Sequence, residues 1–183
     1  MWRLLRRYNS WVMRRPYVSA TVSTGCILGS GDIMMQRIET AWTPEREFDW
    51  PRLLRMSSYG WGVLGPGMAV WYNQCLPRLV VVPKGSETLR TVLWKVLYDQ
   101  ALWAPVFYAV FLYVMTRMEF KSHGQAVEKV KRDFWTCYFT ELLFWPGVMV
   151  ANFMYMPAQM QPIVVSTLLV FWSAFLSWVQ SWE

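Results

Sequence analysis

The chain has 183 residues, of which 55% are hydrophobic and 16% charged, and its formal net charge at pH 7 is +6. A soluble domain usually has about a quarter of its residues charged, so this chain has too few polar side chains to cover a globular surface. Its basic residues stand in short stretches between apolar segments rather than along one face. This distribution argues against a nucleic acid partner and favours a lipid bilayer.

The first fifteen residues predict a basic amphipathic helix. They contain five arginines and no acid, and on a helix most of the arginines separate from the large apolar side chains. The pattern is typical of a mitochondrial transit peptide. It is equally typical of an interfacial helix that anchors a first membrane span, and both interpretations stay open.

Five apolar segments of about bilayer length follow the basic N-terminal stretch. A spanning helix needs roughly 20 residues, and the alternating pattern of membrane-barrel strands is absent. We therefore expect an all-α, polytopic transmembrane bundle of four or five bent spans that forms one integral membrane domain over residues 1–183. The expected spans lie near residues 16–35, 56–77, 96–115, 134–157 and 163–182. Nine basic residues fall on each side of such a bundle, so their distribution predicts no orientation.

Small and polar residues follow one face of the first segment. Gly25 and Gly29 are spaced so that another backbone can approach closely, and Asp32 and Gln36 continue the same face. We expect this face to be a packing seam, with the Gly25 and Gly29 edge as the contact of a homo-oligomer. Alternatively, Asp32 reaches the lipid headgroups from the end of the segment.

Prolines interrupt the second and third segments. Pro66 stands among glycines and predicts a kink in the second. In the third, Asp99 and Gln100 are adjacent, and Pro105 loosens the helix just beyond them. A broken helix beside an acid suits a water-filled path, although Lys95, one turn before Asp99, is placed to neutralise it.

The fourth segment holds an acid without a basic partner inside the segment. Glu141 has no Lys or Arg within helical reach there, and Asn152 falls on nearly the same side of the helix. Pro146 lies between them and predicts a bend. Because a carboxylate at the bilayer centre costs about 2.5–3.5 kcal/mol, we expect Glu141 to face the bundle interior or a pore.

Nothing in the sequence indicates catalysis. His123 is the single histidine, so a histidine metal cluster is not expected, and no phosphate-binding loop, dinucleotide fingerprint or nucleophile elbow is present. We expect no enzyme activity, no metal and no cofactor. The thirteen tryptophans could indicate a cofactor or ligand cage, but several lie near segment ends, where interfacial belts are expected: Trp71, Trp94, Trp135, Trp178 and Trp182.

An ordered set of motifs gives the chain a family resemblance from about Tyr8 to Trp178. The motifs are Gly29-Ser30-Gly31-Asp32 with Gln36, Gly65-Pro66 with Trp71-Tyr72, Asp99-Gln100 with Pro105, Trp145-Pro146 with Ala151-Asn152-Phe153 and Pro157, and Trp172 with Phe175-Leu176-Ser177-Trp178. Together they resemble the Mpv-seventeen family, also called after the twenty-two-kilodalton peroxisomal membrane protein. Met149 and Gln161 depart from the pattern of that family.

The resemblance implies a small protein of the mitochondrial inner membrane or, alternatively, the peroxisomal membrane, usually with four spans. It also implies channel-like permeability and links to reactive-oxygen metabolism and mitochondrial DNA maintenance, and the basic N-terminal stretch favours mitochondria. Our first hypothesis is a weakly selective pore for ions or small metabolites, with Asp32, Asp99, Glu141 and Asn152 exposed to water. A coupled metabolite carrier and a non-transporting structural or assembly protein are the alternatives.

Overall fold

The computed structural model describes residues 14–81, 88–155 and 161–181, and over these residues the chain is helical and contains no strand. The helices run in chain order as α2 (Pro16–Trp42), α3 (Trp50–Tyr59), α4 (Gly65–Val70), α5 (Leu76–Leu79), α6 (Leu89–Tyr98), α7 (Ala104–Met118), α8 (His123–Tyr155) and α9 (Gln161–Gln180). The all-α prediction is confirmed. The amphipathic helix expected at residues 1–15 lies almost wholly outside the described residues.

Three π-helical turns join these helices into longer units. Turn η1 (Gly60–Leu64) connects α3 to α4, turn η2 (Trp71–Cys75) connects α4 to α5, and turn η3 (Asp99–Trp103) connects α6 to α7. The described residues therefore form five continuous helical units, which correspond to the five expected segments.

Each π-turn ends two residues before a proline, namely Pro66, Pro77 or Pro105. Proline has no N–H group, and its ring collides with the carbonyl four residues back in an α-helix. The residue before each proline instead donates its N–H to the carbonyl five residues back, as Ala104 does to Asp99. The predicted helix breaks at Pro66 and Pro105 are thus wide turns. Pro146 differs, because α8 continues as an α-helix through it.

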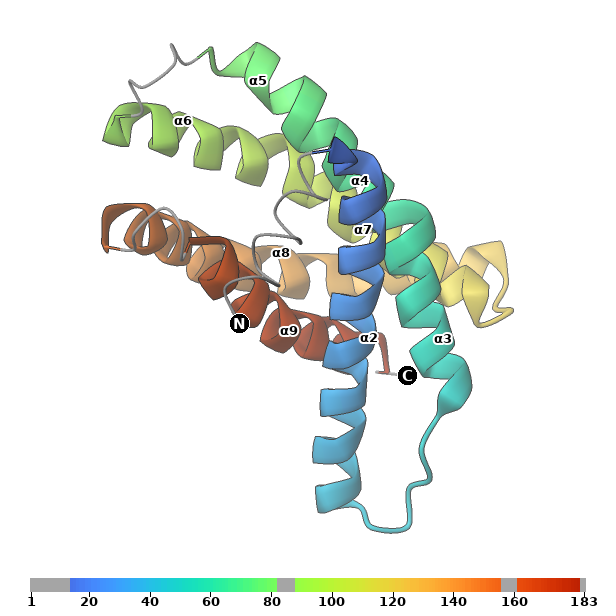
Figure 1. Cartoon of the computed structure of the whole chain (residues 1–183). Coiled ribbons are helices and arrows are strands. Elements are labelled where there is room, and N and C mark those ends of the chain that lie inside the picture. The colour runs from blue at the N-terminus through green and yellow to red at the C-terminus, as the bar shows by residue number, and fades with distance from the viewer. Residues whose placement is uncertain (1–13, 82–87, 156–160, 182–183) are drawn as a thin grey trace.

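Helix α2 runs through the middle of the molecule and packs against α9, α3, α4 and η1, while α7 packs against α8 (Figure 1). Where α2 crosses η1, a Cβ atom on Gly60 would lie 2.6 Å from Cα of Gly25. A Cβ atom on Gly29 would lie 2.5 Å from Oγ of Ser57. The Gly25 and Gly29 face is therefore occupied by the same chain, which corrects its expected role as a contact between copies. The homo-oligomer itself stays a prediction.

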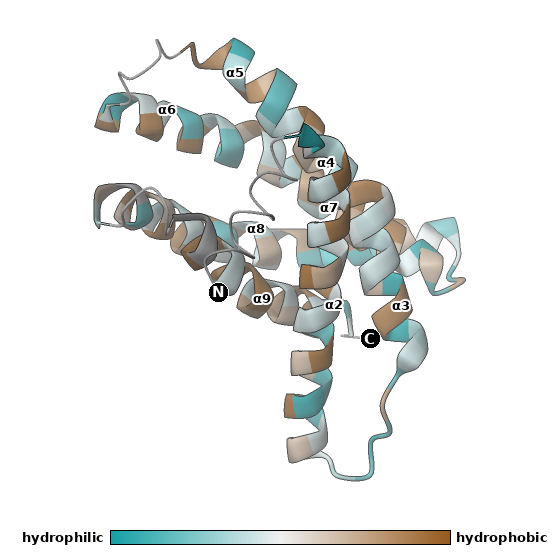
Figure 2. Ribbon diagram, viewed as in Figure 1, coloured by the Kyte–Doolittle hydropathy of each residue, from teal (hydrophilic) through white to brown (hydrophobic). Residues whose placement is uncertain are grey.

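The exterior and the core differ in a way that suits a bilayer. Large apolar side chains such as Leu143, Val106 and Phe171 are exposed, as expected where lipid rather than water surrounds the bundle. Hydrophilic residues mark the loop between α2 and α3 (Figure 2). The largest of the fully buried apolar side chains are Met56, Tyr59, Tyr108, Phe111, Leu112, Met115, Leu176 and Val179.

One continuous helix among the described residues, Leu89–Met118, is both long and apolar enough to cross a membrane, and Val164–Gln180 is a shorter apolar helix. Helix α8 has 33 residues and so a length of about 50 Å, which exceeds the roughly 30 Å of bilayer hydrocarbon. All of its charged side chains except Glu141 lie in its first eleven residues.

Candidate functional site

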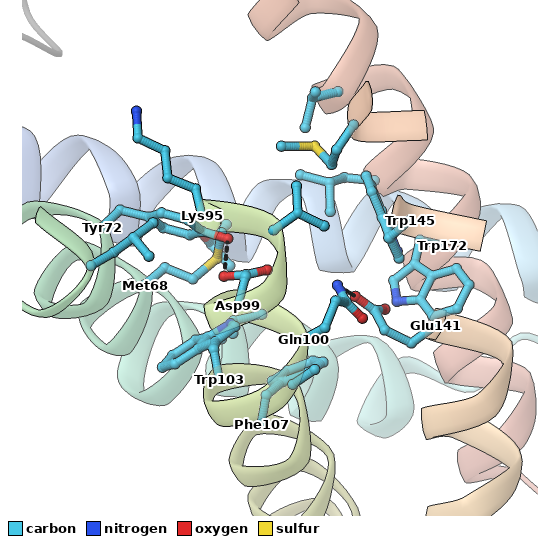
Figure 3. A pocket seen from close by; sticks show the side chains of 18 of the residues that line it. Met68, Tyr72, Lys95, Asp99, Gln100, Trp103, Phe107, Glu141, Trp145 and Trp172 are labelled. Carbon is cyan, nitrogen blue, oxygen red and sulfur yellow. Dashed lines mark hydrogen bonds between the residues drawn. The ribbon is translucent and has the colours of Figure 1, made fainter. Parts of the chain in front are cut away.

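A cavity of about 890 Å³ lies inside the bundle, and all five helical units contribute to its wall. Val81 and Lys95 lie at its accessible end, where α5 and α6 approach their connection. Gln100, Tyr108 and Glu141 lie at its opposite end and are buried. Most of the wall between the two ends is apolar or aromatic, and Figure 3 shows the polar side chains and tryptophans that surround it.

Asp99 opens the π-turn η3 and is held by two aromatic donors. Nε1 of Trp71 and the hydroxyl of Tyr72 both donate to Oδ1 of Asp99, at 2.8 and 2.9 Å. Trp71 is buried, so its expected place in an interfacial belt is wrong. The carboxylate is thus fixed by two residues from η2.

Glu141 is held by two neutral side chains from the η3–α7 unit. Nε2 of Gln100 donates to Oε1 of Glu141 at 3.3 Å, and the hydroxyl of Tyr108 donates to Oε2. Gln100 and Glu141 are 6% and 8% exposed. The prediction that Glu141 faces the bundle interior is confirmed, and its partners come from other helical segments.

The backbone of η3 explains a further contact. If the π-helical pattern continued, the carbonyl of Gln100 would accept from residue 105, which is proline and has no N–H. The hydroxyl of Tyr138 on α8 donates to this carbonyl instead, at 3.1 Å. Because a buried carbonyl without a donor is unfavourable, Tyr138 compensates for the proline.

Asp32 belongs to a different, buried ion-pair cluster. Nε of Arg52 lies 2.8 Å from Oδ1 of Asp32, and the guanidinium of Arg52 also binds Glu39 through two nitrogens, at 2.8 and 3.1 Å. Ser177 on α9 accepts from Arg52 and donates to Asp32. This cluster joins α2, α3 and α9.

Gln36 extends the same cluster towards the start of α3. Its Nε2 donates to Oδ2 of Asp32 at 2.7 Å, and its amide group makes two hydrogen bonds with the backbone of Asp49. Asp49 in turn accepts from the backbone N–H of Arg52 and caps α3. Gln36 therefore fixes the loop between α2 and α3.

The structure brings together some of the predicted polar residues and separates others. Asp99, Gln100 and Glu141 line the large cavity, whereas Asp32 and Gln36 belong to the Arg52 cluster and do not line it. Asn152 is buried on α8 and is also absent from the cavity wall. The idea that all these residues border one water-filled path is wrong for Asp32, which is 0% exposed and paired.

A second, smaller cavity of about 180 Å³ lies at the other end of the bundle. Its wall is largely charged or polar and includes Arg46, Arg55, Glu119 and Lys121. Nε2 of Gln180 donates to Oε1 of Glu119 at 3.1 Å, and Nζ of Lys121 lies 3.1 Å from Oε2 of Glu119. The cavity therefore gathers the loop after α2, the loop after α7 and the end of α9.

A central layer of Tyr59, Phe111 and Leu112 separates the two cavities. All three are at most 2% exposed, and the rings of Tyr59 and Phe111 contact edge to face at 5.3 Å. On α7, Tyr108 borders the large cavity and Met115 the small one. These two residues are seven positions apart, a rise of about 10 Å, so the layer is about two helical turns thick.

The charged start of α8 is anchored to the end of α9. Nζ of Lys129 lies 2.9 Å from Oδ2 of Asp133 and donates to the carbonyl of Val179 at 3.0 Å. Nε of Arg132 lies 2.8 Å from Oδ1 of Asp133. Burial alone would raise the pKa of Asp133, but the hydrogen bonds from Arg132 and Lys129 outweigh it and lower that pKa below its ordinary value.

Sequence reasoning missed several residues of the ion-pair cluster and of the buried end of the large cavity. Arg52, Glu39 and Ser177 carry the ion-pair cluster, and Tyr108 and Tyr138 complete the buried end of the large cavity. No local spacing indicates these partners, because they lie far from one another in the sequence. Over residues 14–81, 88–155 and 161–181, no group of three or more His, Cys, Asp or Glu side chains is placed to hold a metal ion.

Comparison with known proteins finds similarity over nearly the whole chain. The sequence profile described as "Mpv17 / PMP22 family" matches residues 116–177. The chain is 32% identical to "Protein sym-1" of Neurospora crassa, over 96% of this chain and 98% of that protein. It is 30% identical to "Mitochondrial inner membrane protein Mpv17" of Xenopus laevis, over 96% of each. It is also 30% identical to "PXMP2/4 family protein 2" of Dictyostelium discoideum, over 93% of this chain and 87% of that protein. No solved structure matches it.

Proposed function

This chain belongs to the Mpv17 / PMP22 family and is a protein of the mitochondrial inner membrane, and on that premise we propose that it forms a gated, weakly selective channel whose closed state is the one described. Family membership confirms the resemblance drawn from the motifs. The proposal assigns no catalysis to the chain. It also includes the links to reactive-oxygen metabolism and mitochondrial DNA maintenance that the resemblance implies.

Five membrane crossings are part of the proposal, one for each helical unit. Five crossings would put the loops after α2 and α7 and the end of α9 on one side of the membrane. The smaller cavity supports this arrangement, because Arg46, Lys121 and Ser181, one from each of these three places, line it together. The end of α5 and the start of α9 would lie on the other side, and Val81 and Val165 both line the large cavity.

One observation carries the channel proposal: two cavities enter the bundle from opposite ends along the same face of α7. Ala104, Tyr108, Phe111, Leu112 and Met115 follow one another on that face, from the large cavity, through the central layer, to the small cavity. An apolar constriction between two cavities is how a hydrophobic gate blocks water and ions. Movement of this single layer would join the cavities.

Planar-bilayer recording of the purified full-length protein tests the proposal. Phe111→Ala removes a large aromatic side chain from the central layer, so we expect it to raise open probability several-fold over the wild type. Glu141→Gln should reduce the preference for cations, because it removes a carboxylate from the wall of the large cavity. Leu143→Ala, on the exposed side of α8, serves as the control and should leave conductance unchanged. Absence of currents from both the wild type and folded Phe111→Ala would overturn the channel.

A coupled carrier is the second candidate, and the π-turns favour it. Asp99 and Gln100 lie within η3, and discontinuous helices are where many carriers bind their substrates. A carrier would show saturable uptake into liposomes and acceleration by substrate on the opposite side, whereas a channel would show neither. If neither flux nor current is found, the structural or assembly role remains.

A further inference from the structure

The buried end of the large cavity has unused capacity to accept hydrogen bonds. Oε1 of Gln100 belongs to a side chain that is only 6% exposed, and this atom has no hydrogen-bond partner among the described residues. Buried amide oxygens are normally paired, so an unpaired one in a residue that lines a cavity points to a donor supplied from outside the chain.

The neighbouring donors are already engaged. Nε2 of Gln100 and the hydroxyl of Tyr108 both donate to Glu141. Trp71 and Tyr72 both donate to the same oxygen of Asp99, Oδ1, and Asp99 lines the cavity. A molecule that brings a donor to this end can pair with Oε1 of Gln100, and two acidic side chains in the cavity wall, Asp99 and Glu141, favour a positive charge. An ammonium group has three donors and no acceptor, which matches these acceptors.

The rest of the cavity suits a hydrocarbon body. Met68 and Met149 offer flexible thioethers, which adapt to irregular apolar shapes, and Trp103, Trp145 and Trp172 add flat aromatic walls (Figure 3). Tryptophan faces also attract cations near their rings. The volume of about 890 Å³ falls within the range of known small-molecule sites.

We propose that the large cavity binds an amphiphilic primary amine, with the ammonium group at Asp99, Gln100 and Glu141 and the hydrocarbon chain along the methionine and tryptophan wall. Lys95 lies nearer the accessible end, and its side chain extends away from Asp99 (Figure 3). The inference deepens the proposed function, because it names the class of molecule that the large cavity admits. It rests on the proposed function for the placement of this cavity in a membrane. Binding itself does not require conduction.

An ordinary membrane lipid is the competing occupant. Its acyl chain would fill the apolar wall, but an anionic or acceptor-only headgroup would bring no donor to Gln100 and would meet two carboxylates. The test must therefore compare headgroups on one chain length.

Photolabelling of the full-length protein in phosphatidylcholine nanodiscs makes this comparison. The probe is dodecylamine with a diazirine on its terminal carbon, and labelled peptides are mapped by mass spectrometry. We expect adducts on the cavity wall, for example at Met68 or Met149, that fall at least tenfold with excess dodecylamine and change little with excess dodecanol or dodecanoate. Equal competition by all three amphiphiles would mean that the cavity holds bulk lipid, and would overturn the proposal.

Two variants and a control complete the experiment. Asp99→Asn keeps an oxygen that can accept from Trp71 and Tyr72 but removes the charge, and Gln100→Leu removes the unpaired oxygen. Each should weaken amine-specific labelling about tenfold, with circular dichroism and the unfolding temperature reporting that the fold is retained. Glu128→Gln removes an exposed carboxylate of α8 away from the cavity and should leave labelling unchanged. Persistence of amine-specific labelling in both folded cavity variants would also overturn the proposal.

The outcomes separate this inference from the channel. Amine-specific labelling without current would support the binding site and contradict conduction. Current without amine-specific labelling would support conduction and contradict the binding site.

Discussion

Arg52 on α3 and Asp32 on α2 form an ion pair, with Nε and Oδ1 2.8 Å apart, at a place where both side chains are buried. The same guanidinium binds Glu39 and Ser177, so one cation satisfies two acids on α2 and a hydroxyl on α9. The pair therefore fixes how three helices cross, and it is a structural rather than a water-exposed acid site.

Replacing Arg52 by Met should destabilise the protein strongly. The change leaves Asp32 and Glu39 buried without their cation, and breaking a buried pair in this way typically costs about 3–5 kcal/mol. Denaturant unfolding of the detergent-solubilised protein measures the loss. Arg90→Met, at an exposed position of α6, is the control and should change stability by less than about 0.5 kcal/mol. Equal stability of the two variants would show that the cluster does not hold the helices together.

Two glycines of the turn η1 should respond oppositely to alanine. A Cβ atom on Gly60 would lie 2.6 Å from Cα of Gly25, and backbone cannot move aside as a flexible side chain can. We expect Gly60→Ala to cost about 1–3 kcal/mol of unfolding free energy. Gly62→Ala, with nothing within 4 Å of the new methyl group, should be neutral or stabilising by up to about 1 kcal/mol. Thermal unfolding of both variants checks the difference, and a similar loss at both positions would contradict the close crossing.

Tyr138 and Pro105 should be energetically coupled. Tyr138→Phe removes the donor to the Gln100 carbonyl and should cost about 1 kcal/mol. In a Pro105→Ala background residue 105 regains an N–H, which can satisfy that carbonyl, so the cost should fall towards zero. A double-mutant cycle on unfolding free energy measures this coupling. Tyr155→Phe, at an exposed position of α8, controls for loss of a hydroxyl. An unchanged cost in both backgrounds would mean that the proline does not create the need for Tyr138.

The Asp133 cluster predicts a stability that falls in acid. The folded-state pKa of Asp133 lies below its ordinary value, so its contribution is present above the unfolded pKa, near 3.9, and is lost as pH falls through the folded value. Unfolding temperatures of the wild type and Asp133→Asn should therefore differ at pH 6 and converge below about pH 4. Glu128→Gln, at an exposed position of the same helix, should show no such convergence. A difference that stays constant from pH 6 to pH 3 would contradict the assignment.

Local sequence features predicted the helices and their breaks better than the contacts between them. The length of the apolar segments was sufficient to predict the helices. Pro66 and Pro105 were sufficient to predict two of the breaks, because a missing N–H acts within one or two turns of the chain. They also marked Glu141 as an interior residue, since an unpaired acid in an apolar segment needs shelter. The expected bend at Pro146 is not accompanied by a π-turn.

The partners of the acids could not be predicted in the same way. Asp32 pairs with Arg52, which lies in the next helix, and with Ser177, which lies 145 positions away. Asp99 takes its donors from Trp71 and Tyr72, whose position near the end of an apolar segment indicated a membrane interface. These contacts depend on how the helices cross, and the glycine positions that permit the crossings do not reveal which helix will occupy them.

The wide turn η3 changes the phase of the helix that contains it. An α-helix advances about 100° per residue, so one additional residue in a turn rotates everything after it by about that angle. The faces of α6 and α7 are therefore out of register, and a single helical wheel drawn through Leu89–Met118 misplaces one helix relative to the other by about 100°. Scanning mutagenesis of this segment should be read as two separate periodic patterns, one on each side of Asp99–Trp103.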